Sequence, residues 1–380
     1  MAPYTGPAAG AGDSGVSRPA VDPDSAVILV YGDNRLGQRM KVRSRVYRFL
    51  RYRVHSVPAR VALGIVTAPL LVLESLVPTL DGPRDIVTAF THRPRAGGER
   101  QVLDALLASG PFQLVISTGD VVQDGRRARQ WEDYVKRHRP LFARAPYRVA
   151  PGNHERLDTA LGRASWDAAL GAPPRPERYW SSVDLPDSLA RFVFIDGNTL
   201  ANVGGAFPES TAAALSQEQL AWADQALSAA FRYRFIVLHH PLVSAGPHPD
   251  DWTPPASAAR RDQLLSLCRR HQVTAILAGH EHLYQRVFLR DMNGGGIWHV
   301  TTGGGGSPLS PVGAAPRGAL LAESLRVDPE SIHARSVYHY CRLVLPRSSG
   351  QAPSLTVMEV RGRGARVLDR LDLATPGAHP

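Results

Sequence analysis

Short apolar runs of four to six residues recur along the chain, and each is followed closely by glycine, aspartate, asparagine or histidine. This pattern is typical of buried strands that carry polar residues at their C-terminal ends. Five runs show it, at residues 26–31, 114–117, 147–150, 235–238 and 273–277. We therefore expect five strand ends to carry the chemistry of this protein.

Stretches with helical spacing alternate with these strands, which indicates an α/β fold with ligands at the carboxyl ends of the strands. They cover residues 99–108, 127–142, 216–229 and 255–270. The third stretch begins Ser216-Gln217-Glu218-Gln219, which predicts a capping box with Ser216 as the N-cap and Gln219 at the third helical position.

The last third of the chain has strand-like runs with no clear helix between them, which predicts a second, more antiparallel sheet. The runs cover residues 283–289, 297–302, 337–345, 355–360 and 366–373.

The bulk composition, 43% hydrophobic and 21% charged over 380 residues, is that of a globular protein. Two cysteines, Cys268 and Cys341, exclude a disulfide framework. Residues 1–25 are rich in Ala, Gly, Pro and Ser, and they lack the basic start and apolar core of a secretory signal. We expect a flexible tail there, one domain over residues 26–375, and a cytoplasmic protein.

The formal net charge of +10 is concentrated between residues 38 and 60, where eight basic residues and no acidic one occur. This cluster begins the segment 38–97, which we interpret as an insertion because the span from Asp33 to Asp120 exceeds one strand-helix-strand connection. Apolar residues 61–80 follow the cluster. Pro69 and Pro78 interrupt them and argue against a transmembrane helix.

Three interpretations of the insertion stay open. Residues 39–80 fit a peripheral anchor on an anionic membrane surface, because arginines stand next to an apolar stretch. A helical subdomain packed over the catalytic face, with a solvated basic side, explains the same pattern. RNA binding is the third, but the six tryptophans are scattered without base-stacking spacing, so we expect no nucleic-acid partner.

The polar residues at the strand ends are of the types that can hold two metal ions. Hydrolysis of a phosphate ester needs a nucleophile at neutral pH and positive charge beside the phosphoryl oxygens, and two metal ions supply both. Carboxylate, imidazole and amide-oxygen ligands suit such ions, with one carboxylate shared between ions roughly 3.5 to 4 Å apart. The candidate ligands are Asp33, Asp120, Asn153, His239, His280 and His282.

The order of motifs resembles the calcineurin-like metallophosphoesterases, and within them the purple acid phosphatase-like branch. The matching motifs are Gly32-Asp33-Asn34-Arg35, Gly119-Asp120, Gly152-Asn153-His154-Glu155, His239-His240-Pro241 and Gly279-His280-Glu281-His282. The resemblance implies a four-layer α/β/β/α sandwich of two mixed β-sheets with helices outside.

The resemblance also implies roles for these residues. Asp120 would bridge two divalent ions, either Mn, Zn or Fe. Asn153, His239 and His280 would complete one site, while Asp33 and His282 would belong to the other. His154 would steady the phosphate and protonate the leaving oxygen.

Two positions depart from the family pattern. Many members have a histidine where this chain has Arg35, and purple acid phosphatases have a tyrosine where it has Gln123. The first site should therefore bind its ion more weakly. Arg35 could instead grip a substrate phosphate with its guanidinium group, which makes it a candidate catalytic residue.

The reaction that this resemblance implies is attack on phosphorus by a hydroxide that bridges the two metals. The substrate is a phosphate ester, and the choice between monoester and diester stays open. Two alternatives remain: a lipid-directed phosphodiesterase at a membrane surface, and a degenerate phosphate-binding protein with an incomplete first site.

Overall fold

The computed structural model describes residues 23–35, 98–171, 178–290, 295–312, 325, 327 and 329–374. The chain divides into two units, residues 37–98 and the remainder. The predicted insertion, 38–97, and nearly all of the predicted tail, 1–25, lie outside the described residues.

The first sheet has six strands in the order β13-β12-β11-β1-β2-β3. Strands β1, β2 and β3 are parallel, whereas β11 pairs with β1 in the antiparallel direction. The strands are β1 (Ser25–Tyr31), β2 (Leu114–Ser117), β3 (Tyr147–Val149), β11 (His339–Pro346), β12 (Ser354–Arg361) and β13 (Gly364–Asp372).

The second sheet has seven strands in the order β10-β8-β9-β7-β6-β5-β4. Its centre, β5-β6-β7-β9, is parallel, and antiparallel strands flank it. The strands are β4 (Ser181–Asp184), β5 (Ala190–Phe194), β6 (Tyr233–Val237), β7 (Ala275–Ala278), β8 (Tyr284–Arg290), β9 (Gly296–Thr302) and β10 (His333–Arg335).

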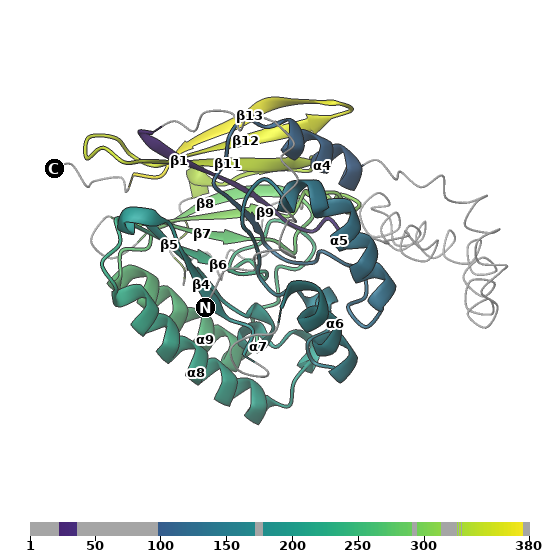
Figure 1. Ribbon diagram of the computed structural model, residues 1–380. Helices are drawn as coiled ribbons and strands as arrows, with labels where there is room; N and C mark the ends of the chain where they lie inside the picture. Colours follow the sequence, from purple (N-terminus) through teal and green to yellow (C-terminus); the bar gives the residue numbers. More distant parts are fainter. Residues whose placement is uncertain are drawn as a thin grey trace, which may run out of the picture. The chain divides into compact units, whose positions relative to one another are not determined.

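Helices cover the outer face of each sheet, as Figure 1 shows. The first sheet packs against α4 (Gly98–Ala108), α5 (Ala128–Phe142) and α6 (Ala160–Leu170). The second packs against α7 (Gly197–Ala201), α8 (Glu209–Ser228) and α9 (Pro255–Arg270).

A third apolar cluster lies between the two sheets and joins them face to face. Within β1, Ile28 and Val30 point into this inner cluster, while Val27 and Leu29 pack against the helices. Both faces of the strand are buried, which explains its continuous apolar run. The predicted four-layer α/β/β/α sandwich is confirmed.

Two predictions of secondary structure are wrong. The C-terminal strands do not form a sheet of their own, because β11 adds to the free edge of β1 and β8 and β9 join the second sheet. Helix α8 begins at Glu209, so Ser216 and Gln219 are not a capping box. Both are buried in mid-helix, where Ser216 Oγ donates to the Thr199 carbonyl and Gln219 bonds to the backbone of Asp196.

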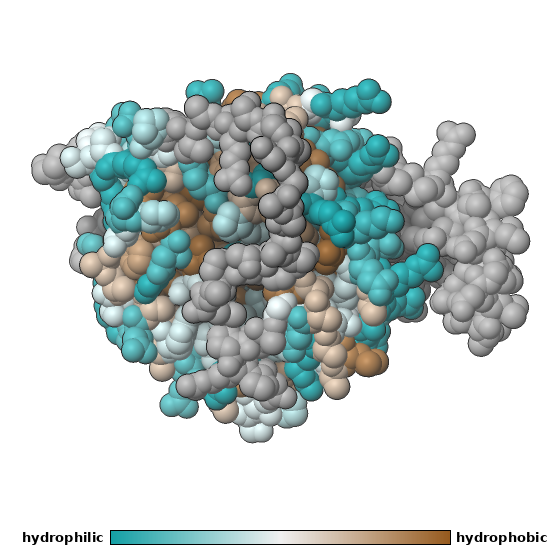
Figure 2. All heavy atoms as spheres, viewed as in Figure 1, coloured by the Kyte–Doolittle hydropathy of each residue, from teal (hydrophilic) through white to brown (hydrophobic). Residues whose placement is uncertain are grey.

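On the face seen in Figure 2, hydrophilic side chains dominate the periphery and apolar side chains gather toward the middle. Among the described residues, the large hydrophobic side chains that are exposed are Leu161, Val203, Val312 and Val367. No helix in the described ranges has the length and apolar character needed to cross a membrane.

Candidate metal centre

The strand ends bring the predicted ligands together where the two sheets meet. In chain order these are Asp33 after β1, Asp120 after β2, Asn153 after β3, His239 after β6, and His280 and His282 after β7. The backbone N–H of Asp33 donates to the Gly119 carbonyl at 2.9 Å, which joins the loops after β1 and β2. The N–H of His280 donates to Asp33 Oδ2 at 2.8 Å and so links the two sheets.

Three of these ligands have left-handed backbone conformations. The φ angles are 60° at Asp33, 54° at Asp120 and 70° at His280. Residues other than glycine rarely adopt this region, and each such residue costs about 1–3 kcal/mol. Strain of this kind persists where the surrounding structure fixes the backbone, and it clusters at functional sites.

Glu155 is a buried carboxylate that ties the loops after β2 and β3 to each other. It accepts backbone N–H bonds from Asp120 at 3.0 Å, Val121 at 2.8 Å and Gly152 at 2.6 Å. Burial raises the pKa of Glu155, while the N–H donors oppose this shift because they favour the charged form. Residue 152 must be glycine, since a Cβ there would collide with Asp120 and Glu155.

Asn153, His239 and His280 form what we call the second ligand group. Asn153 Oδ1 lies 3.0 Å from His239 Nε2 and 3.1 Å from His280 Nδ1, and these two ring nitrogens are 3.1 Å apart. Asp120 Oδ1 lies 3.4 Å from His239 Nε2. Tetrahedral ligation at about 2.0–2.1 Å separates ligand atoms by about 3.3 Å, so this spacing suits a metal ion.

Asp33, Asp120 and His282 form the first ligand group. Their ligand atoms lie within 4.8 Å of one another, and Asp33 Oδ1 is 3.6 Å from His282 Nε2. Burial and the nearby Asp120 carboxylate raise the pKa of Asp33 well above its usual range. Asp33 Oδ1 is buried and has no hydrogen-bond partner among the described residues. A cation here would satisfy this oxygen and relieve the repulsion between the carboxylates.

Backbone carbonyls fix the ring orientation of two histidines. Nδ1 of His239 lies 2.9 Å from the Thr118 carbonyl oxygen, and Nδ1 of His282 lies 2.9 Å from that of Pro308. A carbonyl only accepts, so each Nδ1 carries the proton and each Nε2 presents its lone pair to the ligand groups. Such partners are typical of metal-binding histidines.

Arg35 lies against the predicted bridging carboxylate. Its Nε donates to Asp120 Oδ2 at 2.9 Å, a terminal guanidinium nitrogen is 2.6 Å from the same oxygen, and the Arg35 side chain is 10% exposed. Burial alone would raise the pKa of Asp120. The nearby charges of His239 and Arg35 nevertheless hold this pKa well below its usual range. Arg35 thus brings a fixed positive charge to the centre from the position where many family members have a histidine.

His154 lies beside this centre, and its backbone N–H donates to Asp120 Oδ1 at 2.9 Å. Nδ1 of its ring lies 2.6 Å from the Gln123 carbonyl and therefore donates to it. Nε2 remains as the ring atom that can exchange a proton with a ligand. Burial lowers the pKa of His154. The Gln123 amide lies 3.2 Å from the same Nδ1, so the side chain is turned toward His154.

Sequence analysis assigned no role to four further polar residues near the centre. His240 and Asp251 lie beside His280. The His248 ring is tilted against the His280 ring, with the ring centroids 4.4 Å apart. Glu281 is buried and accepts the backbone N–H of His248 at 2.7 Å. His240 and Glu281 adjoin predicted ligands, which was the available signal. His248 and Asp251 lie in a loop without periodicity, which gave none.

The two ligand groups fit divalent ions by chemistry as well as by spacing. They combine carboxylate oxygens, imidazole nitrogens and one amide oxygen, a donor set that suits first-row transition metals. Burial of both groups would be unfavourable without a cation, because their charged and polar atoms would lack compensation.

Comparisons with known proteins identify the family of this chain. A model of the calcineurin-like phosphoesterase family matches residues 81–284, more than half of the chain. Tartrate-resistant acid phosphatase type 5 of Sus scrofa is 29% identical over 175 residues, which are 44% of this chain and 48% of the pig protein. A probable inactive purple acid phosphatase, number 24 of Arabidopsis thaliana, is 25% identical over 246 residues, which are 56% of this chain and 37% of that protein.

The fold is also found in a solved structure. A purple acid phosphatase from seeds of yellow lupin (Lupinus luteus) superposes with a TM-score of 0.55 at 15% identity, covering 91% of this chain and 53% of the lupin chain. Each comparison therefore spans about half, or less, of the relative's own length.

Proposed function

Since the chain belongs to the calcineurin-like phosphoesterase family, we propose that it hydrolyses a phosphate ester at a centre of two divalent metal ions. The observation that supports this most directly is the second ligand group, whose three ligand atoms lie 3.0–3.1 Å apart beside Asp120 Oδ1. The family uses such dinuclear centres.

The proposed centre assigns a task to each residue. Two bound ions would supply positive charge beside the phosphoryl oxygens and would lower the pKa of water enough to give a nucleophile at neutral pH. Asp120 belongs to the first ligand group, and its Oδ1 lies 3.4 Å from His239 of the second, so this carboxylate would be shared by both. His154, with Nδ1 committed to the Gln123 carbonyl, presents Nε2 as the atom that protonates the leaving oxygen. Arg35 supplies a guanidinium group for the substrate phosphate.

We infer that the ions are Mn, Zn or Fe, because the donor set mixes nitrogen and oxygen ligands. The position of the purple acid phosphatase tyrosine holds Gln123, so an iron-loaded protein should lack a tyrosinate-to-iron colour. A visible charge-transfer band in that protein would contradict the assignment of Gln123.

Metal content and turnover test the proposal together. Wild-type protein loaded with Mn, Zn or Fe should hydrolyse an aryl phosphate monoester or diester, and Asp120→Asn should lose this activity while keeping its circular dichroism spectrum. Activity of Asp120→Asn above a tenth of wild type would exclude Asp120 as the bridge. Asp133→Asn, an exposed change on α5, is the matched control.

A binding protein without turnover is the second candidate. It is favoured by the Arg35 guanidinium on Asp120 Oδ2, where it opposes a first-site ion, and by the relative named as probably inactive. Such a protein would bind phosphate with one tight metal ion and would hydrolyse neither ester. Phosphate binding by calorimetry, run beside the activity assay, separates the two candidates.

A further inference from the structure

Each of the three histidines in the proposed metal centre has one ring nitrogen that faces away from the proposed metal positions. The three differ in the group that lies next to this nitrogen. For His239 and His282 this partner is a backbone carbonyl, as described above. For His280 the nitrogen on the metal side is Nδ1, because it faces Asn153 Oδ1 and His239 Nε2. Its Nε2 faces Asp251, which forms a separate cluster with His240 and His280.

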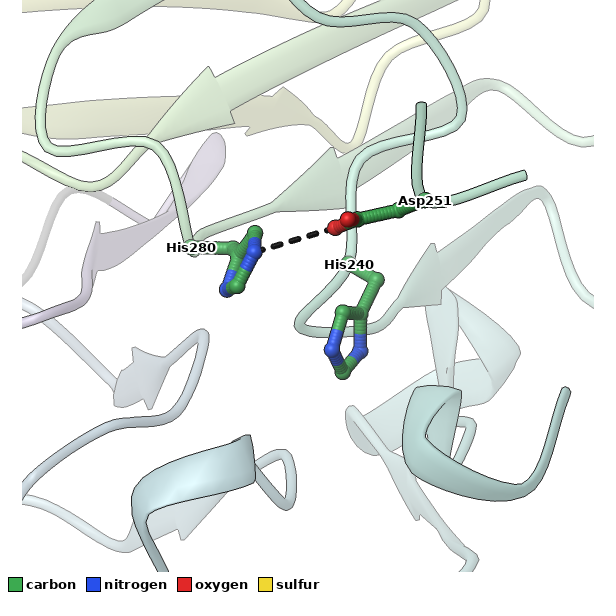
Figure 3. Close-up of side chains that lie close together, drawn as sticks. All are labelled: His240, Asp251 and His280. Carbon is green, nitrogen blue, oxygen red and sulfur yellow. Dashed lines mark ion pairs between the residues drawn. The ribbon is translucent and has the colours of Figure 1, made fainter. Parts of the chain in front are cut away.

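Figure 3 shows the Asp251 carboxylate directed at the His280 ring from a neighbouring loop. Asp251 Oδ2 lies 3.0 Å from His280 Nε2, and the two side chains are 9% and 5% exposed. Neither atom has an aligned hydrogen bond among the described residues, although they are at contact distance.

We propose that Asp251 is a positioning residue that orients His280 for metal binding. A neutral imidazole that binds a metal through Nδ1 must carry its proton on Nε2, and that proton needs a buried acceptor. Asp251 Oδ2 is the acceptor that the structure offers. A carboxylate in this position fixes the ring plane and makes the coordinating nitrogen a stronger ligand.

The loop around Asp251 is anchored well enough to hold this geometry. The indole N–H of the buried Trp252 donates to the Pro241 carbonyl at 2.9 Å, which fixes the residue next to Asp251. The N–H of Thr253 donates to the Asp250 carbonyl at 3.0 Å and closes a turn around Asp251. The backbone that carries Asp251 is thus held in place by its neighbours.

A metal ion within the cluster itself is the competing explanation. His240 is buried, and neither of its ring nitrogens has a hydrogen-bond partner among the described residues. That arrangement, however, would require His280 to bind ions through both nitrogens and to lose both protons. With a hydrogen bond to Asp251 instead, His280 binds one ion through Nδ1 and keeps its proton on Nε2.

The test compares metal affinities of the full chain and its variants by titration calorimetry with Zn²⁺ and by the absorption spectrum of the Co²⁺-loaded protein. In Asp251→Ala the tighter metal site should weaken by about 10- to 100-fold, the range typical of lost partners of this kind. Asp251→Asn keeps an acceptor oxygen and should retain most of the affinity. Asp250→Ala, an exposed neighbour with the same charge loss, should match wild type.

The inference rests on the proposed metal centre, and the outcomes distinguish a failure of the centre from a failure of the role of Asp251. Wild-type protein that binds no metal would overturn the centre itself. Tight binding that Asp251→Ala leaves unchanged, in a variant with wild-type thermal unfolding, would overturn only the role of Asp251. A third ion per chain that both His240→Gln and Asp251→Ala lose would show that the cluster is a metal site instead.

Discussion

Arg35 and Asp120 form the buried ion pair on which the balance of the two proposed metal sites depends. The guanidinium contacts Asp120 Oδ2 with two nitrogens, and Asp120 is fully buried. The guanidinium stabilises the Asp120 carboxylate when no metal is bound. Its positive charge also repels a cation in the first ligand group. Two unit charges near 4 Å interact by about 4 kcal/mol at an effective dielectric constant of 20, so the effect on metal binding should be measurable.

Arg35→Met should therefore change two properties in opposite directions. The metal-free protein should lose about 3 kcal/mol of unfolding free energy, because a buried charge loses its partner. The weaker metal site should tighten by about tenfold or more, and KM should rise if Arg35 also holds the phosphate. Denaturant unfolding with and without Zn²⁺, together with calorimetry, measures both.

Arg126→Met serves as the control for Arg35, because its partner Asp124 lies outside the ligand groups and Arg126 is 44% exposed. It should leave metal affinity unchanged. Two equally tight sites in wild-type protein would contradict the role of Arg35 as a competing charge.

His154→Ala should lower kcat by about 10² to 10⁴-fold while metal content stays at the wild-type level. The reason is that Nδ1 is bonded to the Gln123 carbonyl, so the ring acts on the substrate through Nε2 and does not belong to either ligand group. Metal content by mass spectrometry and single-turnover kinetics check the two parts. Loss of metal would instead make His154 a ligand.

At the scale of elements, α8 shows how a local signal can be misread. Ser216 and Gln219 have the spacing of a capping box, yet the helix starts at Glu209 and both residues point into the protein. Gln219 Oε1 accepts the Asp196 N–H at 2.6 Å, and its amide donates to the Asp196 carbonyl at 3.2 Å. The polar side chains therefore serve as buried anchors for the loop that begins α7.

Gln219→Leu should destabilise the fold by about 2–3 kcal/mol, because it removes the side-chain acceptor of the buried Asp196 N–H, while the Asp196 carbonyl still accepts from the Thr199 hydroxyl. Ser216→Ala, which removes one side-chain bond to Thr199, should cost about 1 kcal/mol. Urea unfolding followed by fluorescence compares the two. Equal, small effects would contradict the role of Gln219 as an anchor of this loop.

The strand ends were predictable because a polar residue after a short apolar run is a local feature. The calcineurin-like family and the four-layer fold are confirmed for the same reason, since their motifs lie at those ends. Strand pairing was harder to predict from the sequence. Ile28 pairs with Leu343, and no local pattern around either residue indicates this pairing. The short strand β4 has one apolar residue, Val183, and no alternation of buried and exposed positions that would mark it as a strand. Asp251 lies in an irregular loop.

At the scale of the whole molecule, the described residues account for the proposed metal centre but not for the basic cluster. The family match begins at residue 81, after the eight basic residues and the apolar stretch 61–80. None of the proposed ligands lies within 38–97. Deleting that segment and joining its ends with a short Gly/Ser link should therefore leave metal binding and hydrolysis of a small aryl phosphate intact.

The same deletion tests whether the insertion is a membrane anchor, which would support a lipid-directed phosphodiesterase. Each Lys or Arg near an anionic surface contributes about 1 kcal/mol, so half of the eight would give salt-sensitive binding. The full chain should sediment with anionic vesicles at low ionic strength, dissociate from them as salt rises, and fail to bind neutral vesicles. The deletion variant should bind neither kind of vesicle.

If the full chain does not bind anionic vesicles, the membrane anchor is excluded and the helical subdomain is the interpretation of the insertion that stays. In that case a deletion that hydrolyses large lipid phosphates faster than the full chain, at an unchanged rate on small esters, would identify the subdomain as a lid that selects substrates.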